Sequence, residues 1–335
     1  MAISYRVGLR TALAAVALSA SMGFMAVGAP VATAQDATPA ASPTAECVAP
    51  ELPPGTPTPP EASPEAAMEG HDMGTPAADA ASPVAEASPV AAEEVGTALS
   101  GADADAATAA VNNLVACVAA DPAKALALMT PEFLLENFGT ENPYDVLAMG
   151  ALEGLSFQDL SVGNSYSYAD GRVGVDVQYK QTAYQVAGER WFLVNDGGTW
   201  KLTSLTPITP TVEGDTTVVG VNLVDYGFEF NVSSIVETEV LMLHAINAGA
   251  EPHELVILRQ PEGMTLDQIT ADPESALETA EFIGVLYLGE PGEQGDLALV
   301  GLEPGKYIAV CGVPTADGTP HYMLGMIAEF EIVGV

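Results

Sequence analysis

The chain has 335 residues, of which 45 are acidic and only 9 are basic, so its formal net charge is −36. Such a field repels the phosphates of nucleic acids and of anionic lipids, which argues against both as partners. The same field attracts metal cations and basic proteins. The length is enough for two domains of ordinary size, or for one domain with long tails.

The first residues have the pattern of an export signal. Arg6 and Arg10 precede a long apolar run, and an Ala-x-Ala motif offers a cleavage site after Ala34. An uncleaved membrane anchor is the alternative, but Pro30 and the many small residues favour removal. We therefore expect residues 1–34 to be a signal peptide, and the mature chain to be secreted or extracytoplasmic without a stable membrane span.

The cysteine count sharpens this expectation, because three cysteines cannot all pair within one chain. Cys47 and Cys117 could form a disulfide in an oxidising compartment, and whether they do is left open by the sequence. Cys311 would then remain unpaired. A free thiol in an exported protein is a liability unless something holds it, and a metal ion would do so.

Residues 35–97 have a low-complexity composition rich in Ala, Pro, Ser and Glu, without aromatic residues. Such a segment buries too little apolar surface to offset the entropy of ordering, so we expect a disordered linker. It contains Met68, His71 and Met73, which could hold copper loosely. The alternative is a chance cluster in a solvated tail.

Residues 98–208 begin with helical signals. Between Val111 and Val118 apolar residues recur at i, i+3, i+4 and i+7, which predicts an amphipathic helix. Two shorter helices are predicted over 121–129 and 130–138, because each starts with an Asp or Thr N-cap followed by Pro.

The period then changes to two. From Val173 to Tyr179 apolar and polar residues alternate, and the turn "NDGG" at 195–198 predicts a hairpin. Helices followed by an antiparallel meander indicate an α+β domain. This order resembles the nuclear-transport-factor-2-like cone fold. Some members of that family use a His–Asp pair, but 98–208 has no histidine, so we interpret it as a binding or spacer domain rather than a catalytic one.

Residues 215–335 are predicted to form an all-β domain. Short apolar runs are separated by Gly and Pro, and one segment, 265–282, has a helical composition. Many short strands at near-regular spacing are typical of a sandwich or a Greek-key barrel. The predicted strands lie within 216–230, 237–249, 253–260, 283–289, 296–302, 306–312 and 325–333.

Four metal-binding side chains lie in this β region: His253, Cys311, His321 and Met326. Two imidazoles and a thiolate with a weak thioether are the donor set of a copper electron-transfer site. Cu(I) favours soft donors and low coordination, whereas Cu(II) favours nitrogen. An intermediate arrangement that is held fixed changes little on electron transfer. Taken singly, each residue could be a core or surface residue, but their order and spacing favour a shared site.

The stretch from His253 and the Cys-x9-His-x4-Met pattern resemble the type 1 (blue) copper domain of plastocyanin-like cupredoxins. The resemblance implies a Greek-key sandwich with one type 1 copper at one end. His253, Cys311 and His321 would be equatorial ligands and Met326 the axial ligand. Two features depart from the family: the Cys-to-His loop is long, and Glu254 stands where many members have Asn. Either departure is compatible with a distorted site or one that has lost its metal.

Our leading hypothesis is therefore an exported one-electron carrier that is not an enzyme and that exchanges electrons with a redox protein. The sequence identifies neither that partner nor the oligomeric state. A copper chaperone or storage protein is the alternative. A copper enzyme such as a nitrite reductase would need a second copper site, for which only His71 and His244 remain. His244 alternates with apolar neighbours, and we expect it to face solvent from a strand.

Overall fold

The structure is a computed structural model that describes residues 46–52, 54–57, 96–152, 155, 157–232 and 234–334. The predicted signal peptide and most of the predicted linker, with Met68, His71 and Met73, lie outside the described residues. Within the described part, no helix is long and apolar enough to cross a membrane.

In the first half of the described chain helices precede a run of antiparallel strands, as predicted, although there are four helices rather than the three predicted. The helices are α2 (Ala102–Ala120), α3 (Pro122–Ala127), α4 (Pro131–Phe138) and α5 (Pro143–Ala148). Asp121 and Thr130 cap α3 and α4 by accepting backbone N–H groups, with proline in the first turn of each. Asn142 caps α5, a helix that the sequence analysis did not predict.

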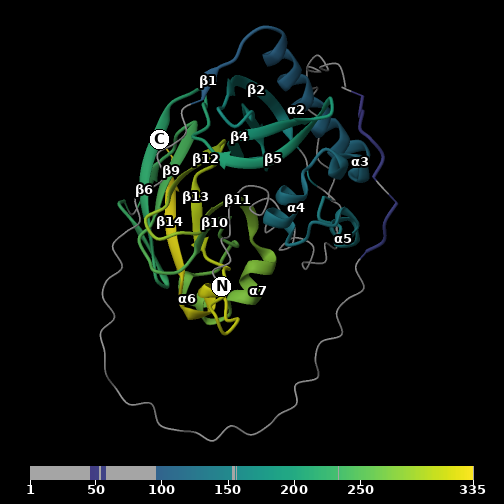
Figure 1. Ribbon diagram of the computed structural model, residues 1–335. Helices are drawn as coiled ribbons and strands as arrows, with labels where there is room; N and C mark the ends of the chain where they lie inside the picture. Colours follow the sequence, from purple (N-terminus) through teal and green to yellow (C-terminus); the bar gives the residue numbers. More distant parts are fainter. Residues whose placement is uncertain are drawn as a thin grey trace, which may run out of the picture.

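The strands of this half form one antiparallel sheet against which the helices pack. They are β1 (Thr97–Ala98), β2 (Gln158–Ser167), β3 (Val173–Lys180), β4 (Gln185–Asp196) and β5 (Thr199–Pro207). The predicted alternation is confirmed in β3, where Val175, Val177 and Tyr179 are buried under α2. Figure 1 shows α2 to α5 together on one side of the molecule.

A disulfide between Cys47 and Cys117 joins the segment before this half to the last turn of α2. Asn113, one turn earlier in the helix, accepts the Val48 N–H and donates to the Val48 carbonyl, at 2.8 and 2.7 Å. The pairing that the sequence left open is thus present. It leaves Cys311 as the free thiol of the three cysteines.

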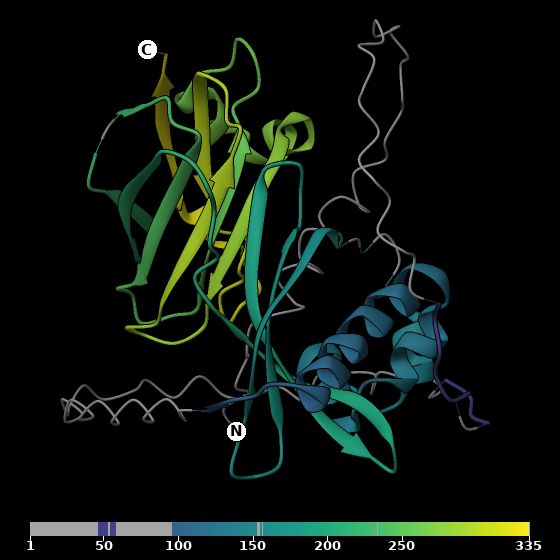
Figure 2. The same cartoon turned by 90° about the horizontal axis from the view of Figure 1, so that it is seen from above.

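The second half consists of two facing sheets. Its elements are β6 (Thr216–Val224), β7 (Gly227–Phe230), β8 (Ser234–Val236), β9 (Val240–Asn247), β10 (His253–Arg259), α6 (Leu266–Ala271), α7 (Pro273–Thr279), β11 (Glu281–Leu288), β12 (Gln294–Val300), β13 (Gly305–Val310), a 3₁₀ turn η1 (His321–Leu324) and β14 (Ile327–Val333). One sheet has the order β12-β9-β6-β7 and the other β11-β10-β13-β14-β8. Figure 2 shows the two layers face to face, away from the helices of the first half.

The alternation along β10 explains how the second sheet is covered on both sides. Leu255 and Ile257 point into the core between the sheets, whereas Val256 and Leu258 pack on the outer face. The helices α6 and α7 cover that outer face, in the segment whose composition predicted a helix. The predicted strand 216–230 is broken by a turn at Asp225 and Tyr226, which separates β6 from β7.

A single sheet runs through both halves, which the sequence did not indicate. Strand β4 pairs with β12 at Val186↔Ala298 and Gln185↔Leu299, so that β1 to β7, β9 and β12 belong to one nine-stranded sheet. The Gln185 side chain also bonds the backbone of Val285, donating to its carbonyl and accepting its N–H, both at 2.9 Å. The two halves are therefore joined by backbone and side-chain hydrogen bonds.

Glu189 is an acid buried inside the first half. Its carboxyl accepts a hydrogen bond of 2.7 Å from Trp191 Nε1, and its exposed fraction is 7%. Burial raises the pKa of Glu189 above its ordinary 4.5, and the hydrogen bonds from Trp191 and Tyr179 oppose this only in part. The folded protein therefore holds the proton of this carboxyl to a higher pH than the unfolded chain does.

The parent protein should lose stability as pH rises, because Glu189 must ionise in a buried place. We expect Glu189→Gln to abolish this loss. Between the unfolded and folded pKa values the native state binds more protons, so the free energy of unfolding falls as pH rises. Each pKa unit corresponds to about 1.4 kcal/mol. Chemical denaturation from pH 4 to 7 should show the stability difference, variant minus parent, growing with pH. Glu141→Gln, at an exposed position, should show no such trend. Parallel curves for Glu189→Gln and the parent would contradict the assignment.

Candidate metal centre

The strand order brings the predicted ligands to one end of the second sheet. Strand β10 pairs antiparallel with β13, and β13 pairs antiparallel with β14. The start of β10, the end of β13 and the start of β14 therefore meet at the same end of the sheet. His253 begins β10, Cys311 directly follows β13, His321 begins η1, and Met326 directly precedes β14.

Three of the four predicted ligands converge there. The ligand atoms of His253, Cys311 and His321 lie within 4.8 Å of one another. His253 Nδ1 is 3.2 Å from His321 Nδ1, which is 3.4 Å from Cys311 Sγ. All three residues have an exposed fraction of 0%. Two imidazole nitrogens and a sulfur thus face a common point inside the protein.

Met326 is fully buried in the same core cluster as Cys311. Its backbone N–H donates to the His321 carbonyl at 3.1 Å, and its carbonyl accepts the Cys311 N–H at 3.3 Å. These bonds fix its backbone against both neighbours.

The long loop between Cys311 and His321 is closed by its own hydrogen bonds. Thr315 N–H donates to the Thr319 carbonyl at 2.9 Å, and His321 N–H donates to the Val313 carbonyl at 3.0 Å. Tyr322 N–H then returns to the Cys311 carbonyl at 2.8 Å. The added length is therefore taken up in a folded-back hairpin, and His321 still reaches Cys311.

Glu254 braces the cysteine from the neighbouring strand. Its side chain accepts the Gly312 N–H at 2.8 Å, and its own N–H points at Cys311 Sγ at 3.4 Å. Burial raises the pKa of the Glu254 carboxyl. Glu254 thus connects β10 to the residue that follows Cys311.

A bound metal ion would change the protonation of the cluster. Burial raises the pKa of the Cys311 thiol from 9.0 to about 12, and burial lowers the pKa of His253. A thiolate would be costly in this apolar setting without a positive charge beside it. A metal ion supplies that charge, so binding would release the thiol proton. A soft sulfur with two imidazoles suits copper or zinc better than magnesium or calcium.

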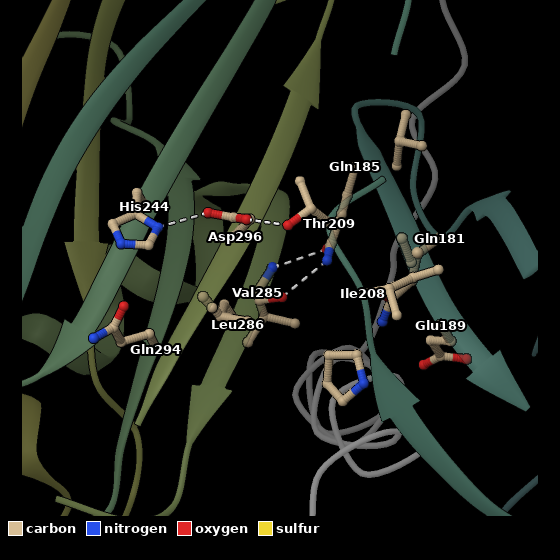
Figure 3. A pocket seen from close by; sticks show the side chains of 15 residues that line it. Gln181, Gln185, Glu189, Ile208, Thr209, His244, Val285, Leu286, Gln294 and Asp296 are labelled. Atoms are coloured by element: carbon tan, nitrogen blue, oxygen red, sulfur yellow. Dashed lines mark hydrogen bonds and ion pairs between the residues drawn. The ribbon is translucent and has the colours of Figure 1, made fainter. Parts of the chain in front are cut away.

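His244 does not belong to this cluster. It lies on β9, and its side chain is 40% exposed while Nδ1 is 2.8 Å from Asp296 Oδ1 on β12. Figure 3 shows this pair beside Thr209, which donates to the same carboxylate. They line a pocket of about 220 Å³ where the two halves meet. The expectation of a strand histidine in contact with solvent holds for part of its side chain.

The sequence analysis missed the carboxylates around the histidines. Asp225 Oδ1 is 3.2 Å from His253 Nε2, and Glu251 Oε2 is 3.0 Å from His321 Nε2. Asp225 lies within a predicted strand, and Glu251 lies in the loop before β10. The sequence offered one sign of Glu251, which stands two residues before the predicted ligand His253. It offered no sign that Asp225 would contact a ligand histidine.

No protein-family model and no curated protein sequence matches this chain. Its structure is similar to that of dithionite-reduced auracyanin from Roseiflexus castenholzii, with 18% identity and a TM-score of 0.26 over 36% of this chain and 99% of that one. Auracyanin A, a "blue" copper protein from Chloroflexus aurantiacus, is 15% identical with a TM-score of 0.25, and the match covers 35% of this chain and 99% of that one. Rusticyanin from Thiobacillus ferrooxidans is 16% identical with a TM-score of 0.24, and the match covers 36% of this chain and 79% of that one. Each of these matches covers about a third of this chain.

Proposed function

We propose that the protein is an exported copper-binding protein whose 215–335 domain carries one electron at a time. One type 1 copper would be held by His253, Cys311 and His321, with Met326 as the axial ligand. The observation that supports this most directly is the convergence of one nitrogen from each imidazole and the Cys311 sulfur within 4.8 Å in a buried place. Bound copper would supply the one-electron change between its two oxidation states.

The chain's own part in this function is to hold the donors still and to keep water out. Each ligand is attached to a strand end or to a short hydrogen-bonded turn, so that it has little freedom to move. A donor set fixed between the preferences of Cu(I) and Cu(II) needs little rearrangement on electron transfer. The absence of exposed surface on all three residues supports electron transfer through protein rather than direct substrate binding.

The remaining elements of the proposal concern location and the other domain. The Cys47–Cys117 disulfide supports an oxidising compartment, in agreement with cleavage of residues 1–34 as a signal peptide. The helices and strands of 98–208 support a cone-like domain that serves as a spacer or binding module. The sandwich at 215–335 would follow the Greek-key arrangement. A redox protein would deliver or accept the electron.

Adding Cu(II) to the full chain tests the proposal. We expect a visible thiolate-to-copper charge-transfer band that saturates at one copper per chain and is absent from a Cys311→Ser variant. Cys311 is the free thiol, so the band has a single thiolate source. His244→Ala serves as the matched control, because His244 lies outside the cluster, and should keep the band. Stoichiometric copper binding without colour would refute a type 1 site.

A further inference from the structure

Each histidine of the metal centre has its outer nitrogen against a carboxylate. The contacts are His253 Nε2 to Asp225 at 3.2 Å and His321 Nε2 to Glu251 at 3.0 Å. Both Nδ1 atoms face inward, 3.2 Å from each other. Each imidazole therefore has a carboxylate at its outer Nε2 atom, while its Nδ1 atom faces the metal centre.

Asp225 is fixed by the backbone around it. The Ala250 N–H donates to Asp225 Oδ1 at 2.8 Å, and the Glu251 N–H approaches the same atom at 3.4 Å. Asp225 Oδ1 therefore accepts backbone N–H groups and acts as an acceptor on the side that faces His253. A carboxylate only accepts hydrogen bonds. His253 must then carry its proton on Nε2, which leaves the Nδ1 lone pair pointing into the site.

Gly249 is required for the approach of Asp225 to His253. A Cβ atom at this position would lie 2.5 Å from His253 Nε2 and would overlap Asp225 Oδ1. Only glycine leaves that space free. The loop before β10 is thus shaped around the carboxylate–imidazole contact.

Glu251 is in close contact with the outer nitrogen of His321. Glu251 Oε2 and His321 Nε2 are both buried and lie 3.0 Å apart, and neither atom makes a hydrogen bond within the described part of the chain. The ring of Tyr226 stands edge-on to the His321 ring, with centroids 5.3 Å apart, and helps to cover it. Tyr226 follows Asp225 in the β6–β7 turn and has a φ of 64°. This one turn therefore contacts both metal-site histidines.

We propose that Asp225 and Glu251 are positioning residues that hold both imidazoles with Nε2–H outward and Nδ1 free for the metal. The inference rests on the proposed copper function and deepens it. Partners of this kind raise the donor strength of a ligand histidine. Their negative charge also stabilises Cu(II) more than Cu(I), so together they lower the reduction potential of the site.

Charge-neutral variants test the effect on the metal. We expect Asp225→Asn and Glu251→Gln each to weaken Cu(II) binding about 10- to 100-fold, and Cu(I) binding less. A tenfold difference between the two losses equals a rise of 59 mV in potential. Asp296→Asn is the matched control, since Asp296 pairs with His244 at 2.8 Å outside the site. Unchanged affinity and potential in both variants, or an equal shift in the control, would overturn the proposal.

A second measurement needs no copper. Long-range ¹H–¹⁵N spectra of the metal-free protein should show His253 and His321 protonated on Nε2 in the parent. Asp225→Ala and Glu251→Ala should each shift the corresponding histidine toward a tautomer mixture, while Asp225→Asn, which keeps an oxygen acceptor, should retain most of the Nε2–H form. Nδ1–H tautomers in the parent would overturn the positioning roles. If these spectra behave as expected but copper gives no charge-transfer band, the copper function is wrong and the positioning roles stand.

Discussion

Replacing Cys47 and Cys117 together with alanine is expected to lower the free energy of unfolding by about 4 kcal/mol. The two residues are 70 positions apart, so their bridge restricts a long loop in the unfolded chain. Alanine suits the fully buried Cys117 position because it adds no polar group to the core. A loss of this size is a large part of the 5–15 kcal/mol that is usual for a domain.

The loss can be followed by fluorescence during chemical denaturation. Trp191 and Trp200, the two tryptophans of the chain, both lie in the first half and report on its unfolding. Reduction of the parent protein should produce the same destabilisation, whereas Cys311→Ala should leave the disulfide contribution in place. A double variant with the parent's denaturation midpoint would show that the disulfide adds little to stability.

Shortening Met326 to alanine should destabilise the fold by about 2–5 kcal/mol, because the residue is fully buried in the sandwich core. Met326→Leu keeps nearly the same volume and should cost less than about 1.5 kcal/mol. Both changes remove the thioether. If this sulfur is the axial ligand, both copper-loaded variants should show altered absorption and reduction potential despite their different stabilities.

The comparison of stability with spectrum separates the packing of Met326 from its role as a ligand. Thermal unfolding of the metal-free proteins measures the packing contribution. Absorption and potentiometry of the copper-loaded proteins measure the contribution as a ligand. Met242→Leu is the matched control, since Met242 is buried near the junction of the two halves and outside the metal centre. A Met326→Leu protein with the parent's spectrum and potential would leave Met326 as a core residue only.

The continuous sheet gives the two halves a physical connection. Pairing of β4 with β12, and the bonds of Gln185 to Val285, place the first half on strands of the sandwich. Strand β11, which contains Val285, also pairs with β10, and His253 lies opposite Leu288 at its far end. The first half is thus attached to the sheet that supports the metal centre.

The sequence by itself determined the features that depend on neighbouring residues. Proline after an Asp or Thr cap predicted α3 and α4, and strict alternation predicted β3, because local periodicity decides which side of an element is buried. The short spacing from Cys311 to Met326 pointed to a shared site for the same reason. Three of the proposed ligands lie within one loop and its flanking strand ends.

Only the tertiary structure decided which distant segments meet. The Cys47–Cys117 disulfide and the pairing of β4 with β12 join positions that are far apart in the sequence. The burial of Glu189 likewise cannot be predicted from the periodicity of its neighbours. Asp225 reaches His253 because a tight turn after β6 lies beside the loop before β10, with Gly249 leaving the space between them. Such contacts depend on which distant strands pair and on close packing across the sandwich, and the local spacing of residues specifies neither.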